Sequence, residues 1–148
     1  MSYKINMLRQ YDSLLNEFII PLIGNDKTTT SDQLEEAGVH FFGKSLVFPS
    51  DRLPKLNSRK KYAIINVDKH DQPGSHWIAL AFDTLKRKRV LYNSLGESAD
   101  SIMPQLGEVE ENHRYDAEQS AKESDCGQRS LAWLLFLHIY GISAALKI

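Results

Sequence analysis

The chain contains a single cysteine, Cys126, which lies in the sequence Ser-Asp-Cys-Gly-Gln at the start of the longest apolar run. One cysteine cannot form an internal disulfide or a thiolate zinc site, so a chemical role for this sulfur would be nucleophilic. The alternative is a small buried hydrophobe, because free cysteine is among the most buried residue types. The other residue types that a thiol protease needs lie upstream, at His76, Asn93 and Gln119.

His76 and Asn93 are expected to meet across an antiparallel hairpin. One apolar segment follows His76, another precedes Asn93, and the polar segment 83–86 between them is typical of a turn. A symmetric turn there places the two residues directly opposite each other, with Cβ atoms about 4.5–5.5 Å apart. The Asn93 oxygen would then accept the Nδ1–H of His76 and direct Nε2 toward the nucleophile. The alternative is a polar residue that closes the hairpin.

Cys126 and Gln119 complete the predicted site. Cys126 lies where a buried helix is expected to begin, and backbone N–H groups with the positive end of the helix dipole favour thiolate over thiol. Gly127 would let another chain approach the sulfur closely, and Asp125 is expected to cap the helix. The backbone N–H of Cys126 and the side-chain amide of Gln119 could donate to a developing oxyanion. A solvated loop glutamine is the alternative.

The elements that would position these residues can be read from the apolar pattern. Strands in the middle of the chain and helices toward both ends predict an α+β domain in which a small mixed or antiparallel sheet packs on a buried helix. Gly43 to Lys61 is expected to be irregular. The predicted helices are 5–20 (ended by Pro21), 32–38 (ended by Gly38), a short one near 101–106, and 128–140; the predicted strands are 62–67, 77–82 and 89–92.

Length and composition are those of an ordinary globular chain. We expect one domain over residues 1–148, with 42% hydrophobic and 25% charged residues and a formal net charge of -1. This charge gives no overall case for nucleic-acid or membrane binding. No signal peptide is evident at the N-terminus. We therefore expect a soluble monomer.

Two further groups of residues are candidates for a functional role. His40, His70, His113 and His138 are alternative bases, but His70 has no matching orienter and His138 falls in the buried helix as a core residue. The basic run Lys86, Arg87, Lys88 and Arg89 occupies the expected hairpin tip. A solvated face is the ordinary interpretation of such a run, and weak DNA binding is the alternative.

The ordered motifs resemble those of the adenain-like cysteine proteases, a family that also includes the SUMO-deconjugating enzymes. They are His-Trp (76–77), Tyr-Asn-Ser-Leu-Gly (92–96), Gln119 and Asp-Cys-Gly (125–127). The chain is most similar to the small maturation proteases of adenovirus, virophages and related double-stranded DNA viruses, from about residue 30 to residue 140. The resemblance also implies the fold, with the buried helix beginning at the nucleophilic cysteine.

The resemblance implies a role for each site residue. Cys126 would be the nucleophile, His76 the base, Asn93 its orienter and Gln119 an oxyanion donor. Trp77, together with Gly127, would bind substrate at a narrow groove that accepts glycine, with a core tryptophan as the alternative. Asn93 departs from the acidic residue commonest at its position, which leaves an imidazolium less stabilised.

The implied function is a cysteine endopeptidase that cleaves after glycine and processes viral capsid precursors during virion maturation, in the host cytoplasm, a viral factory or the virion. A ubiquitin-like deconjugating protease, an effector-type acetyltransferase and an inactive binding module are the alternatives. We expect that no cofactor is required. DNA or an activating peptide is implied only by the resemblance, and no second cysteine exists to link such a peptide covalently.

Overall fold

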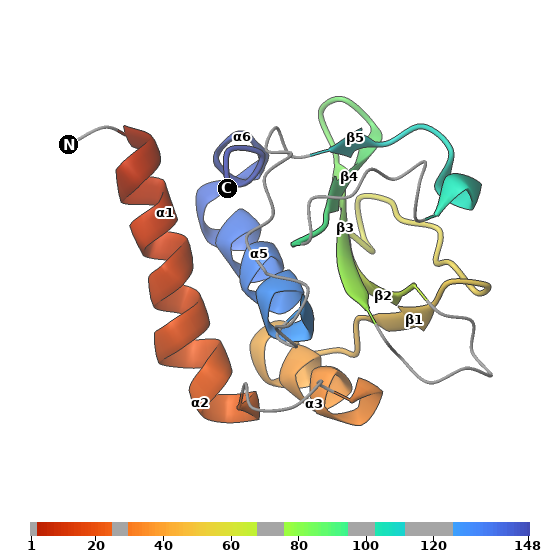
Figure 1. The fold of residues 1–148 in the computed structure, drawn as a ribbon. Helices are drawn as coiled ribbons and strands as arrows, with labels where there is room; N and C mark the ends of the chain where they lie inside the picture. The colour runs from red at the N-terminus through yellow and green to blue at the C-terminus, as the bar shows by residue number, and fades with distance from the viewer. Residues whose placement is uncertain (1–2, 25–29, 68–75, 95–102, 112–125) are drawn as a thin grey trace.

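The computed structural model describes residues 3–24, 30–67, 76–94, 103–111 and 126–148, and its centre is a five-stranded sheet of order β1-β2-β3-β4-β5 (Figure 1). The strands are β1 (Val47–Pro49), β2 (Tyr62–Asn66), β3 (Trp77–Asp83), β4 (Lys88–Tyr92) and β5 (Glu110–Glu111). The three central strands are antiparallel to one another, whereas both edge strands pair in parallel. The predicted α+β class with a mixed sheet is confirmed.

The central strands are buried on both faces because their residues are apolar without alternation. In β2, Ile64 packs in one core cluster, whereas Ala63 and Ile65 pack in the other. The first cluster lies between the sheet and the helices. The second lies on the opposite face, where the segments around Leu56 and Leu106 cover the sheet (Figure 1).

Helix α5 (Cys126–Tyr140) packs along β3 and begins at the cysteine, as predicted. It is buried on nearly every face, since apolar side chains surround its axis. Trp133 stacks on Tyr92 with ring centroids 5.3 Å apart and donates its indole N–H to the Ala145 carbonyl at 3.0 Å. That carbonyl belongs to the short helix α6 (Ile142–Ala145), so the C-terminal residues close over α5.

The N-terminal helix continues past the proline that was predicted to end it. α1 (Tyr3–Ser13), the π-helical segment η1 (Leu14–Ile19) and α2 (Ile20–Ile23) follow one another as one long helical segment (Figure 1). Pro21 lies in the first turn of α2, directly after η1, whose hydrogen bonds run from residue i to i+5. The i−4 bond that proline cannot make is therefore not required there.

Helix α3 (Ser31–Phe42) is longer than predicted because Gly38 does not end it. Thr30 caps its start, because its hydroxyl oxygen accepts from the Gln33 N–H at 3.2 Å. The helix ends before Gly43, whose φ of 78° is left-handed. At Gly38 a Cβ would lie 3.1 Å from the Lys44 carbonyl oxygen, so this glycine serves close packing.

Two strands lie where the sequence analysis expected no regular structure. β1 falls in the segment 43–61 and pairs with β2, and β5 pairs with the far side of β4. The short helix expected near 101–106 is a 3₁₀ turn, η2 (Pro104–Leu106), and residues 101 and 102 lie outside the described ranges. Within those ranges, no helix is long and apolar enough to cross a membrane.

Candidate active site

The register of the β3–β4 hairpin differs from the predicted one. Ala79 pairs with Tyr92, so Asn93 lies opposite Ile78 and is a diagonal neighbour of His76. The prediction that His76 and Asn93 are directly opposed is therefore wrong. Diagonal neighbours across an antiparallel pair are still within reach of long side chains.

The shift in register has its cause at the other end of the hairpin. Asp83, expected in the turn, is the last residue of β3, and its carboxylate accepts from the backbone N–H groups of Leu85 and Lys86 at 3.0 and 3.3 Å. Arg87 takes a left-handed φ of 56° before β4 begins at Lys88. These features move the turn one residue toward the C-terminus.

His76 and Asn93 are hydrogen-bonded at the open end of the hairpin. The distance from His76 Nε2 to Asn93 Oδ1 is 2.8 Å, and Asn93 is 5% exposed. An amide oxygen only accepts, so Nε2 carries the proton and Nδ1 keeps the lone pair. The roles of the two nitrogens are therefore the reverse of those predicted. Nδ1, rather than Nε2, is the nitrogen that can act as a base.

The backbone carbonyls of His76 and Trp77 are bonded to neighbouring elements. The His76 carbonyl accepts from the Val67 N–H at 2.9 Å, and the Trp77 carbonyl accepts from the Ser130 hydroxyl at 3.2 Å. Trp77 itself is 1% exposed and belongs to the core cluster under the helices. Its burial favours the core interpretation, and its role in a substrate groove stays a prediction.

Helix α5 brings Cys126 to the same end of the sheet. Ser130, one turn after Cys126, bonds the residue that follows His76, and four residues of helix rise about 6 Å. The start of α5 therefore lies beside the start of β3 (Figure 1). Cys126 is buried in the first turn of α5, where the helix dipole favours a thiolate. Gly127 is also buried, and its contact with substrate stays a prediction.

One polar residue of α5 was missed by the sequence analysis. Gln128 is 1% exposed, and its Nε2 donates to the Gly24 carbonyl at 2.7 Å. Its Oε1 has no hydrogen-bond partner in the described part of the chain. The bond joins the first turn of α5 to the end of α2. The available signal was an amide two residues after the cysteine, in the first turn of a helix expected to be buried.

The remaining candidates lie elsewhere or outside the described residues. Gln119, Asp125, His70 and His113 lie outside them, so their assigned roles stay predictions. His138 was predicted to be a core residue, but it is exposed near the end of α5, where its Nδ1 lies 3.0 Å from the Tyr62 hydroxyl. Burial raises the pKa of Tyr62, which keeps this phenol protonated.

The other candidate residues lie on other elements of the fold. His40 lies on α3, with its ring edge-on to Phe41. The basic run 86–89 lies at the hairpin tip, and DNA binding there stays a prediction. No group of three or more His, Cys, Asp or Glu residues within the described ranges is arranged to hold a metal ion.

Comparison with known proteins assigns the chain to a family. The family model of the adenovirus endoprotease matches residues 48–140, more than half of the chain, and this stretch includes His76, Asn93, Gln119 and Cys126. Neither a curated protein nor a solved structure matches the chain. The chain therefore belongs to the adenovirus endoprotease family of viral cysteine endopeptidases.

Proposed function

We propose that this protein is a maturation endopeptidase that cleaves viral capsid and other structural precursors after glycine. The observation that carries the proposal is the bond from His76 to Asn93 at the end of the sheet where α5 begins with Cys126. Membership of a viral cysteine protease family supports the same assignment. The glycine preference and the capsid substrates are carried by the resemblance of the motifs.

The first half of the reaction forms an acyl-enzyme. Nδ1 of His76 takes the proton of the Cys126 thiol, and the resulting thiolate attacks the carbonyl carbon of the scissile peptide bond. As the C–N bond breaks, the imidazolium returns its proton to the leaving amine. Asn93 keeps Nε2 protonated and the ring in position throughout, but as a neutral amide it stabilises the imidazolium less than a carboxylate would.

The second half of the reaction releases the new carboxyl terminus. His76 takes a proton from water, the water oxygen attacks the thioester carbon, and the Cys126 thiol is regenerated. Both halves pass through a tetrahedral oxyanion. The backbone N–H of Cys126 and the side-chain amide of Gln119 are the proposed donors to it.

Deconjugation of a ubiquitin-like protein is the competing activity, because the motifs Asp-Cys-Gly and Tyr-Asn-Ser-Leu-Gly are similar to those of the SUMO proteases. The decisive experiment incubates the protein with ubiquitin and SUMO suicide probes and, in parallel, with a viral capsid precursor. Precursor cleavage after glycine, without probe labelling, is the expected result. Labelling of Cys126 by a probe, without precursor cleavage, would favour deconjugation. The Cys126→Ala variant is the control in both arms.

A further inference from the structure

A basic pocket lies at the tip of the β3–β4 hairpin, at the opposite end from His76. Its volume is about 410 Å³. The hairpin contributes four consecutive cations to its lining, and the loop before β2 contributes Pro54, Lys55 and Leu56. Phe82 and Leu56 belong to the apolar cluster on this face of the sheet, so the pocket combines positive charge with an apolar wall.

The protein's own acidic segment already occupies one side of this hairpin. Residues Glu108 to Glu111 read Glu-Val-Glu-Glu, and the last two of them form strand β5 beside β4. Lys88 pairs with Glu108 at 3.7 Å, and Lys86 pairs with Glu110 at 3.5 Å. This side of the hairpin therefore shows what the basic run binds: carboxylates on either side of an apolar residue.

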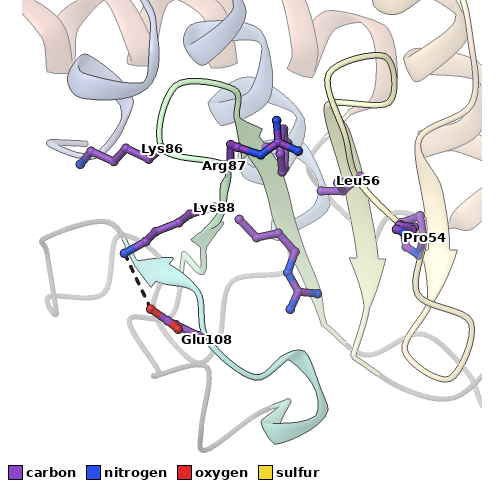
Figure 2. Close-up of a pocket in the computed structure, with 9 residues that line it drawn as sticks. Pro54, Leu56, Lys86, Arg87, Lys88 and Glu108 are labelled. Atoms are coloured by element: carbon purple, nitrogen blue, oxygen red, sulfur yellow. Dashed lines mark ion pairs between the residues drawn. The ribbon is translucent and has the colours of Figure 1, made fainter.

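The other side of the hairpin offers cations that this segment does not use. Figure 2 shows Arg87 reaching toward Leu56 and Pro54, whereas Lys86 and Lys88 point the other way and Lys88 meets Glu108. Arg87 and Lys55 are exposed, and neither has an ion pair with any of the described residues. Arg89 is used differently, since it donates to the Leu106 carbonyl.

The backbone at Arg87 is in an unfavourable conformation. Its φ of 56° is the only positive value at a non-glycine residue in the described ranges, and glycine or asparagine tolerates this conformation better. Strained positions of this kind cluster at active sites and ligand-binding sites. The strain and the position of the guanidinium at the pocket wall together favour a binding role for Arg87.

We propose that this pocket binds an acidic segment of the protein substrate, with carboxylates that flank an apolar side chain. That this segment belongs to a cleaved protein rests on the proposed function. Charge complementarity and the apolar wall favour such a peptide over DNA, because a phosphate backbone carries negative charge but offers no apolar side chain for the wall to bind. An apolar side chain between carboxylates would instead lie against Leu56 and Phe82.

The length of β3 sets where the acidic segment must lie in the substrate. β3 has 7 residues, which at ~3.3 Å per residue separate the tip from His76 by about 23 Å. An extended substrate therefore needs about six or more residues between the scissile bond and the acidic segment. The pocket would raise affinity without touching the reacting atoms.

Binding is tested on the full chain carrying Cys126→Ala, so that cleavage plays no part. Fluorescence anisotropy would follow a fluorescein-labelled peptide containing Glu-Glu-Val-Glu-Glu, beside peptides containing Gln-Gln-Val-Gln-Gln and Glu-Glu-Gly-Glu-Glu and a labelled 20-base-pair DNA. We expect the first peptide to bind most tightly and its affinity to fall with added salt. Stronger binding of DNA, or equal binding of the glutamine peptide, would overturn the proposal.

Arg87→Gly separates binding from folding. This substitution relieves the backbone strain and removes the guanidinium, so the peptide affinity should fall about tenfold while Tm stays unchanged or rises. Arg9→Ala removes one positive charge from α1, outside the pocket, and should leave the affinity unchanged. Equal affinities of Arg87→Gly and the parent protein would reject the site.

The active protein tests the substrate assignment. Adding Glu-Glu-Val-Glu-Glu about eight residues from a cleavable glycine site should lower KM and leave kcat unchanged, and Arg87→Gly should abolish the difference. Unchanged KM despite peptide binding would overturn the assignment to substrate. The two hypotheses can fail separately. If the peptide binds but no substrate is cleaved, the proposed function is wrong. If substrates are cleaved normally but the peptide does not bind, the proposed role of the pocket is wrong.

Discussion

The two ends of the β3–β4 hairpin differ in burial and in charge. At the open end, Tyr92 and Ser94 are fully buried, and Asn93 is held by its bond to His76. At the tip, the side chain of Leu85 is 94% exposed and four consecutive cations follow it. Groups at the open end are fixed by packing, whereas those at the tip are held mainly by the turn. Substitutions at the open end should therefore change catalysis, and those at the tip should change binding alone.

The largest effect is expected at the nucleophile. Cys126→Ala should abolish peptide cleavage, since no other thiol exists in the chain. It should change the free energy of unfolding by about 1 kcal/mol or less, because a small residue still fills the site. A peptide-cleavage assay and thermal unfolding measure the two quantities. Substantial proteolysis by this variant would contradict the mechanism.

The next largest effect is expected from the proposed oxyanion donor. Gln119→Ala should lower kcat by roughly 10²–10³, the usual cost of losing one such donor. Alkylation of Cys126 by iodoacetamide builds no oxyanion, so its rate should stay nearly unchanged. If alkylation and proteolysis fell together, Gln119 would have a structural role instead.

A smaller loss is expected at the orienting residue. Asn93→Ala should lower kcat by up to about 10²-fold with little change in KM, because the orientation of His76 matters mainly in the transition state. Asn93→Asp should remain active, since a carboxylate can accept from Nε2 and also stabilise the imidazolium. An inactive but folded aspartate variant would mean that another residue orients His76.

Ser130 should affect stability more than chemistry. Ser130→Ala removes the bond that ties α5 to the Trp77 carbonyl, at a cost of about 1–2 kcal/mol in the free energy of unfolding. We expect kcat to fall by less than tenfold. Ser143→Ala, on the exposed side of α6, is the matched control and should cost less than about 0.5 kcal/mol. Equal chemical denaturation curves for the two variants would show that the bond contributes little.

The smallest effect is expected at the hairpin tip. Leu85→Ser should leave kcat on a short peptide unchanged and alter the free energy of unfolding by less than about 0.5 kcal/mol, since the side chain buries almost nothing. Urea denaturation and initial rates would measure both. A loss above about 1 kcal/mol would show that the tip is coupled to the core, and the contrast between the two ends would no longer hold.

Local patterns were sufficient to predict the central elements. β2, β3 and α5 are mainly apolar and largely buried, and β4 ends in the buried apolar run Val90–Tyr92, so the sequence indicates all four without reference to distant residues. β1 and β5 could not be predicted in this way. They have 3 and 2 residues, and they are strands only because they pair with β2 and β4.

The residues of the candidate site were predicted better than their geometry. That His76 and Asn93 meet was foreseen, but the register depended on the Asp83 carboxylate and on Arg87, which composition alone does not reveal. The choice between Nδ1 and Nε2 depends on the direction from which the imidazole approaches the amide. The bond from Gln128 to Gly24 joins residues 104 positions apart, beyond the reach of any local pattern.

That last bond also bears on where the working enzyme begins. The family match starts at residue 48, yet Gly24 and the buried residues Leu15 and Ile19 belong to the helices before it. A fragment cut to the matched segment would leave the Gln128 amide without its acceptor and uncover the apolar side of α5. We therefore expect the smallest active unit of this protease to be longer than the segment that matches the family model.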